Sequence, residues 1–218
     1  MSLKNKDYII IRQAFAVELM DFCNHALKIK RNAMHILRNT DNFFGPLSVH
    51  IKNWFGTWED PQAPGNFSVY GDNAMETLLL MAHPLMEERT KMKLLPCYAY
   101  ARIYETGAEL KKHKDRPSCE ISCTVNMGGD MWPIYLKDKN KKIKVELKCG
   151  DMLIYKGTKL QHWREKFKKK ECSQVFLHYV EKDGKHGDNF RDMRCEETVN
   201  PNNEDRFTAK FDENDWRQ

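Results

Sequence analysis

The sequence predicts a mainly β protein with supporting helices, in which an antiparallel sandwich or barrel follows a largely helical N-terminal part. Two observations carry this prediction. Before about residue 95 the apolar side chains recur with helical spacing, whereas from Pro96 onward short apolar runs alternate with turn residues. Breaks fall at Gly107, Gly128, Gly129 and Gly150, as expected for antiparallel strands joined by tight connections.

The N-terminal part is predicted to begin with one strand and one helix. Tyr8–Ile11 is a short β-branched run that indicates a strand. Residues 14–29 then show the periodicity of an amphipathic helix. The apolar face predicted for this helix consists of Leu19, Phe22, Ala26 and Ile29.

A second helix is predicted to begin at residue 73. Asn73 followed by Glu76 resembles a capping box, in which two side chains satisfy the free amides of a helix start. Pro84 is expected to kink the helix. Its apolar residues are expected to support the sheet from below: Leu79, Leu80, Met81 and Leu85.

The connection at residues 40–70 contains three prolines and is predicted to be irregular. It could form a lid over a site or pack against the sheet, and the sequence leaves both alternatives open. Its aromatic residues are Phe43, Phe44, Trp54, Phe55 and Trp58.

A single domain in three parts is expected from 218 residues. Residues 1–95 would supply the first strand, the helices and the aromatic loop, residues 96–182 the β core with the site, and residues 183–218 a polar extension. Six strands are predicted in the core, at residues 98–104, 121–127, 134–136, 143–147, 152–155 and 175–180.

Composition excludes several classes of protein. No run approaches the 18 apolar residues of a membrane span, and Met1 to Lys6 has no apolar signal region. The seven cysteines are scattered and contain no CxxC pair, so they are interpreted as free thiols of a reducing cytoplasm. A soluble, cytoplasmic protein is expected.

Lysines concentrate at residues 137–148 and 166–170, within a net charge of +5. We interpret both stretches as solvated, because lysines commonly protect strand edges from aggregation. The alternative is a patch that attracts an acidic substrate or nucleic acid. We expect no aromatic residues to interleave with these lysines, as a single-strand binding platform would require. Nucleic acid is therefore not expected as a partner.

The candidate site rests on His113 and Asp115, one residue apart, and on His162, 47 positions later. Two imidazoles and a carboxylate suit a divalent first-row metal and leave coordination positions open. A second histidine–aspartate pair, His186 and Asp188, lies in a polar stretch, and no histidine follows it. Because chance matches to so short a motif are common, context must separate the two copies.

The context of the first copy resembles the iron(II)/2-oxoglutarate-dependent oxygenases, in their prolyl-4-hydroxylase-like branch. Tyr104-x-x-Gly107-x5-His113-x-Asp115 is similar to the family's approach to its first two ligands. The run from Cys149 to Tyr155, with Gly-Asp before apolar residues, is similar to the strand that precedes the distal histidine.

This resemblance implies a double-stranded β-helix (jelly roll, cupin-like) in which His113, Asp115 and His162 bind Fe(II). It further implies 2-oxoglutarate and O₂ as co-substrates and is compatible with ascorbate. The expected reaction is hydroxylation of an unidentified substrate, a peptidyl proline or a small molecule, with release of succinate and CO₂. The alternative from another class is a non-catalytic jelly-roll domain that binds a metal or a ligand.

The sequence departs from the family at the residue that anchors 2-oxoglutarate. Members usually carry Arg or Lys nine to eleven residues beyond the distal histidine, where this chain has Glu171, Cys172 and Ser173. Arg164 is the best replacement, because residues i and i+2 of a strand share a face, so Arg164 should point into the same cavity as His162.

Other residues complete the predicted co-substrate site. Lys170, Arg116 and Arg102 remain alternatives for the cation. Tyr104 matches the position where family members present a tyrosine hydroxyl to the co-substrate. Thr124, with Asn126, is expected to line the cavity, and Trp163 is expected to face outward.

Overall fold

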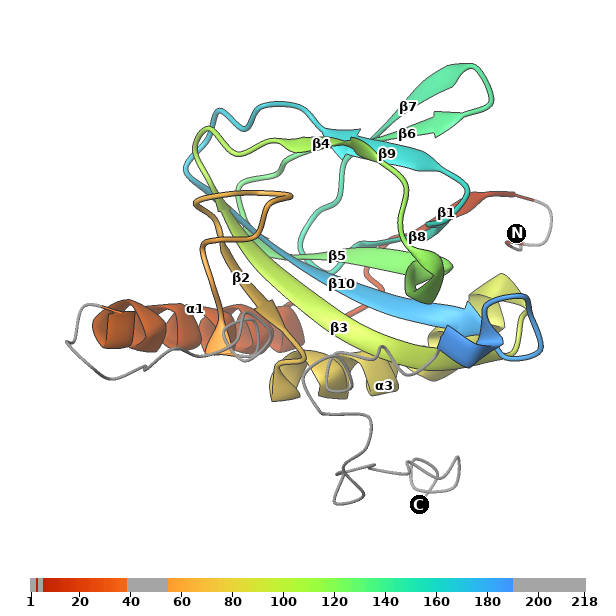
Figure 1. Ribbon diagram of the computed structural model, residues 1–218, viewed down its shortest axis with the longest axis horizontal. Helices are drawn as coiled ribbons and strands as arrows, with labels where there is room; N and C mark the ends of the chain where they lie inside the picture. The colour runs from red at the N-terminus through yellow and green to blue at the C-terminus, as the bar shows by residue number, and fades with distance from the viewer. Residues whose placement is uncertain (1–2, 4–5, 39–54, 190–218) are drawn as a thin grey trace, which may run out of the picture.

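The computed structural model describes residue 3 and residues 6–38 and 55–189, which form two antiparallel β-sheets facing each other (Figure 1). The larger sheet has the order β1 (Tyr8–Ile11), β8 (Met152–Lys156), β5 (Ile121–Gly129), β10 (Glu171–Glu181), β3 (Leu94–Glu105), β2 (Phe67–Tyr70). The smaller sheet has the order β4 (Leu110–His113), β9 (Gln161–Arg164), β6 (Ile134–Asp138), β7 (Lys141–Val145).

From β3 onward the chain passes back and forth between the two sheets. β3, β5, β8 and β10 lie in the larger sheet, and β4, β6, β7 and β9 lie in the smaller one. The longest strands pair centrally, since β10 lies between β3 and β5 along most of its length. This winding is that of a jelly roll, as the family resemblance implied.

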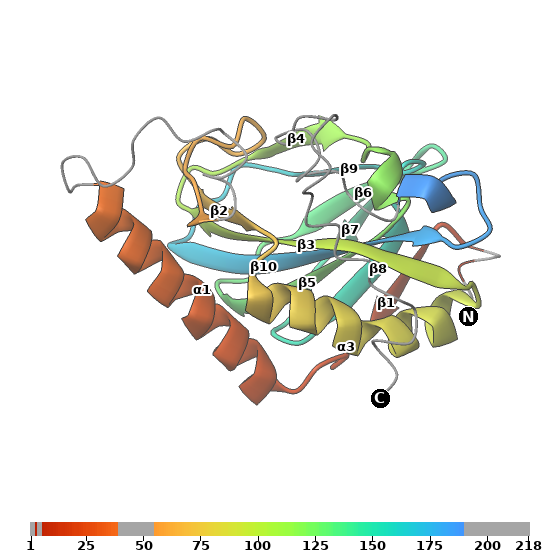
Figure 2. The same cartoon turned by 60° about the horizontal axis from the view of Figure 1, so that its bottom comes forward.

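The two faces of the larger sheet differ in chemistry because side chains alternate along each strand. On β3, Ala99, Ala101 and Ile103 face an apolar core shared with helices α1 (Val17–Arg38) and α3 (Asn73–Thr90). Both helices lie against this side of the sheet (Figure 2). The alternate residues of β3 face the smaller sheet and line the cavity described below: Tyr98, Tyr100, Arg102 and Tyr104.

The apolar face predicted for the first helix is wrong at two of its four residues, whereas Leu19 is partly buried against the core. α1 runs from Val17 to Arg38, and Phe22 and Ile29 are 64% and 68% exposed. The buried residues are instead Met20, Cys23, Asn24 and Leu27. This helix carries apolar side chains on two faces, and each residue turns the helix by about 100°. Only its packing against β5 selects which face is buried.

The start of α3 also differs from the prediction. Asp72, not Asn73, is the N-cap, and its carboxylate accepts a hydrogen bond from Ala74 N at 3.0 Å. Glu76 accepts from Ala99 N of β3 at 2.9 Å, so it ties the helix to the sheet rather than closing a capping box. Met81 is 57% exposed and lies outside the core. The helix continues through Pro84.

All six predicted strands are present, with shifted ends. The hairpin strand β7 ends at Val145 rather than at residue 147. Part of the 40–70 connection is not irregular, because Phe67–Tyr70 forms β2 and pairs with β3. The aromatic residues Phe43, Phe44 and Trp54 lie outside the described residues. Among the helices described, none is long and apolar enough to cross a membrane.

Candidate metal centre

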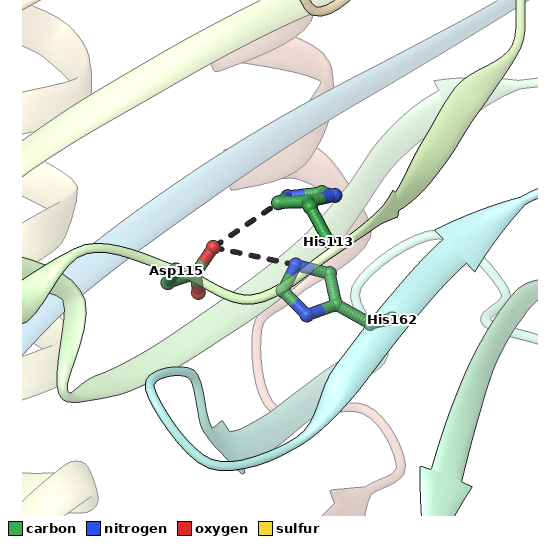
Figure 3. A group of neighbouring side chains, drawn as sticks. All are labelled: His113, Asp115 and His162. Atoms are coloured by element: carbon green, nitrogen blue, oxygen red, sulfur yellow. Dashed lines mark ion pairs between the residues drawn. The ribbon is translucent and has the colours of Figure 1, made fainter.

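Two histidines of the smaller sheet and one aspartate in the loop after β4 point toward one another (Figure 3). β4 ends at His113, which pairs with His162 of β9, and the two imidazole centroids lie 4.2 Å apart. Asp115 follows two residues later, and its Oδ1 lies 3.7 Å from His113 Nε2 and 3.3 Å from His162 Nε2. The three ligand atoms lie within 4.8 Å of one another. This donor set fits a divalent first-row metal.

Backbone carbonyls fix which nitrogen of each histidine faces the site. His113 Nδ1 lies 2.7 Å from Lys111 O, and His162 Nδ1 lies 3.1 Å from Leu160 O. A carbonyl only accepts, so each Nδ1 must carry the proton and donate it. Both Nε2 lone pairs are then directed toward Asp115, which is the tautomer that a metal ligand needs.

The Asp115 carboxylate is held in place from the side opposite the histidines. Ser122 Oγ donates to Asp115 Oδ2 at 2.8 Å and also lies 2.9 Å from His178 Nδ1. The Asp115 amide donates to Gly157 O at 3.0 Å. Burial raises the pKa of Asp115, but the N–H and positive charge of His162 in its protonated, metal-free form, together with the Ser122 hydroxyl, outweigh burial, and the pKa falls to about 2. The carboxylate is therefore anionic at neutral pH. Burial, followed by the neighbouring His162, lowers the pKa of His113.

A cavity of about 450 Å³ opens onto the three residues, within the range of small-molecule sites. Its wall is the polar face of the larger sheet, with Tyr70, Tyr98 and Tyr100 close together; the Tyr70 and Tyr98 rings stack at 4.6 Å. Arg102 and Asp60 complete this side.

Arg102 is the hub of a saturated polar network in this wall. It donates to Ser68 Oγ at 2.8 Å, to the Tyr104 hydroxyl at 3.0 Å, and to Asp60 Oδ2. The Tyr100 hydroxyl also donates to Asp60. The loop that carries Asp60 therefore lines one side of the cavity and also contacts the larger sheet, whereas residues 40–54 of the same connection lie outside the described residues.

The predicted co-substrate residues fall in different places. Tyr104 lines the cavity. Thr124 and Arg164 are buried and are not among the residues that line this cavity. Arg164 nevertheless extends from β9 toward the larger sheet, where it contacts Gln174 of β10. Lys170 is exposed, and its backbone amide bonds Asp130 at 3.0 Å. Of the alternative cations, Arg102 and Arg116 both line the cavity.

Behind the cavity, Arg164 and Thr124 meet at one side chain. Arg164 Nη2 and Thr124 Oγ1 each donate to Gln174 Oε1 at 3.1 Å, and Arg164 Nη1 donates to Trp132 O. Arg164 Nε is buried without a partner. Arg164 is only 1% exposed. Among the described residues, its guanidinium contacts a carbonyl, an amide and an aromatic ring, which are all neutral groups.

Sequence reasoning missed several residues that support the candidate metal ligands or the cavity wall. Ser122 lies two residues before Thr124 on the same strand face, so the alternation that selected Thr124 could have included it. His178 is on the cavity face of β10. Asp60 lies in a loop and Gly157 in a turn, and neither position carries a local pattern.

The second histidine–aspartate pair builds no metal site among the residues that are described. His186 lies in the turn after β10, and Asp188 is in the short 3₁₀ helix η2 (Gly187–Asn189). His113, Asp115 and His162 are the one group there with metal-ligand geometry.

Comparison with known proteins gives likenesses in structure alone. No protein-family model matches the chain, and no curated protein matches it in sequence. A prolyl-4-hydroxylase from Pseudomonas putida superposes with a TM-score of 0.58 at 11% identity, over 81% of this chain and 94% of that one. This chain therefore shares its fold with that prolyl-4-hydroxylase.

Two further solved structures carry ligands. A prolyl hydroxylase from Trichoplax adhaerens, in complex with a hypoxia inducible factor peptide fragment, has a TM-score of 0.59 at 13% identity, over 85% of this chain and 88% of that one. HygX from Streptomyces hygroscopicus, with nickel and 2-oxoglutarate bound, has a TM-score of 0.57 at 12% identity, over 83% and 85%.

Proposed function

We propose that the protein is an Fe(II)- and 2-oxoglutarate-dependent dioxygenase that hydroxylates its substrate with release of succinate and CO₂. The observation that carries this proposal is the convergence of two Nε2 atoms and one carboxylate oxygen at a cavity of a jelly roll. When bound, Fe(II) together with the 2-oxo acid and O₂ would supply the oxidising chemistry. A domain that only binds a ligand needs no such open face.

The protein residues hold this chemistry in position. His113, Asp115 and His162 would hold the metal, and Lys111 O and Leu160 O keep the two imidazoles in the required tautomer. Ser122 keeps the Asp115 carboxylate facing the histidines. The tyrosines of the larger sheet exclude bulk water from one side of the cavity.

For the anchor of 2-oxoglutarate we favour Arg164. A guanidinium buried among neutral partners is costly, and a carboxylate would compensate it. It also carries an unpaired Nε–H for that carboxylate. Arg102 lines the cavity, but Asp60 already neutralises it. Binding at Arg164 requires the cavity to extend past Gln174, with Thr124 and Tyr104 as further donors.

The substrate proposed is a peptidyl proline or a small molecule. The cavity has the volume for one side chain or one small ring system and opens to the exterior past the exposed residues Lys114 and Arg116. Related folds take both kinds, since the Trichoplax structure holds a peptide fragment and a HygX structure holds hygromycin B.

The six cysteines described are free thiols, which supports a location in a reducing cytoplasm.

Anaerobic addition of Fe(II) and 2-oxoglutarate tests the proposal. We expect a visible charge-transfer band and, with O₂, formation of succinate. His113→Ala should abolish both while the unfolding temperature changes little. His186→Ala is the matched control, because it removes the histidine of the other pair and should leave both signals intact. If the protein binds the metal but gives no charge-transfer band, the result supports the alternative, a non-catalytic metal-binding domain.

The anchor is tested separately by titrating 2-oxoglutarate into the metal-loaded protein. Arg164→Lys should weaken binding about tenfold or more, because a bidentate fork becomes a point charge. Lys170→Ala, a surface change of one charge, should leave affinity unchanged. If Lys170→Ala loses affinity and Arg164→Lys keeps it, the anchor is Lys170.

A further inference from the structure

The outer face of the smaller sheet gathers aromatic and basic side chains from all four strands. Tyr135 of β6 and Trp163 of β9 are cross-strand partners, and their rings stack at 5.6 Å with planes 18° apart. Lys112 of β4 lies 4.3 Å from the Trp163 ring centroid, and Lys142 of β7 lies 4.2 Å from that of Tyr135. The expectation that no aromatic residues interleave with the lysines is therefore wrong.

The segment of the chain from which this face is built is rich in positive charge. Residues 109–170 contain seventeen Lys or Arg and eight Asp or Glu, whereas the whole chain has 36 and 31. Lys137 and Lys142 are cross-strand neighbours, and Lys144 is the neighbour of Tyr135. All three lysines are exposed. The charge therefore surrounds the ring pair.

We propose that this surface binds a single-stranded nucleic acid, with bases stacked on Tyr135 and Trp163 and phosphates held by the surrounding lysines. A sheet with aromatic residues on its two central strands and cations on its edge strands offers both interactions at once. Stacking accepts any base, because every base has a π-face, and lysines track the backbone. This binding is separate from the oxidation proposed above, since His113 and His162 face the other side of the same strands.

The existing contacts of the face do not block such a ligand. Glu165 pairs with Lys142, and Glu146 pairs with Lys144, but in both pairs each side chain is between 43% and 55% exposed. Exposed ion pairs contribute little, and an exposed cation–π contact is weaker than a base stack. The lysines can therefore leave the rings for phosphates when bases replace them.

The experiment is fluorescence anisotropy of the full chain with labelled RNA and DNA single strands of about 12 nucleotides. We expect micromolar or tighter binding that weakens as salt rises from about 50 to about 200 mM. Tyr135→Ala and Trp163→Leu should each weaken binding about tenfold or more. Trp163→Phe keeps a ring and should retain most of the affinity. Metal titration of each variant checks that the strands remain folded.

Charge controls separate stacking from general attraction. Lys142→Glu with Lys144→Glu should reduce affinity and the salt slope. Lys168→Glu with Lys170→Glu makes the same charge change in the loop before β10 and should have a smaller effect. Absence of binding overturns the proposal. The proposal is also overturned if duplex nucleic acid or heparin binds as tightly as the single strands and if Tyr135→Ala leaves that affinity unchanged. Ring-dependent binding to phosphatidylserine vesicles without binding to oligonucleotides would assign the face to membranes instead.

Discussion

Gly157 and Asp115 lie so close that no side chain fits between them. A Cβ built on Gly157 would overlap both the Cys119 carbonyl oxygen and Asp115 Oδ2, and would lie 2.8 Å from Ser122 Oγ. The Gly157 carbonyl also accepts the Asp115 amide at 3.0 Å. The turn between β8 and β9 therefore sets the position of the one carboxylate in the candidate metal centre.

We predict that Gly157→Ala displaces the Asp115 carboxylate. The affinity for Co(II) or Fe(II) should fall about tenfold to a hundredfold, as for loss of a supporting contact of a metal ligand. The overlap should also cost about 1–3 kcal/mol of stability. Calorimetric metal titration measures the first effect and denaturant unfolding the second. Thr158→Ala, in the same turn, should change neither, and an unchanged metal affinity in Gly157→Ala would refute the prediction.

We predict that Ser122→Ala weakens metal binding by about tenfold to a hundredfold, because Asp115 Oδ2 loses its hydroxyl partner. Ser173→Ala is the matched control. Both serines are 0% exposed in the larger sheet, but the Ser173 hydroxyl has no partner among the described residues. Removing it should leave metal affinity unchanged and stability equal or slightly higher. Equal metal affinities in the two variants would exclude a positioning role for Ser122.

The Asp60 network should make stability depend on pH. Burial raises the pKa of Asp60, but the charge of Arg102 and the Tyr100 hydroxyl outweigh it, and the pKa is lowered. A lowered folded-state pKa means that the ionised carboxylate stabilises the fold above the unfolded value, near 3.9. This contribution is lost as the pH falls through the folded-state pKa.

We therefore predict that Asp60→Asn lowers the free energy of unfolding by about 1–3 kcal/mol at pH 7. The difference from the native chain should shrink below about pH 4. Urea unfolding across this range is the measurement. Glu59→Gln, the exposed neighbour, should show no comparable loss. A deficit that stays constant down to about pH 3 would contradict the assignment to the ionised carboxylate.

From local patterns the sequence predicted a mainly β protein with an antiparallel sandwich or barrel, its six core strands, and a candidate metal site at His113, Asp115 and His162. These follow from local patterns, since alternation places residues on sheet faces and the ligand types define the metal chemistry. The resemblance of the segments around His113 and before His162 added the winding, and the structure brings the ligand atoms within 4.8 Å.

Tertiary packing alone decided the rest. Which face of α1 is buried depends on β5, because Phe22 and Met20 are both apolar and only one can point at the sheet. The pairing of Asp60 with Arg102, the clearance at Gly157 and the stacking of Tyr135 on Trp163 each join residues distant in sequence. Such contacts depend on distances set by the assembled sheets, and no local period encodes them.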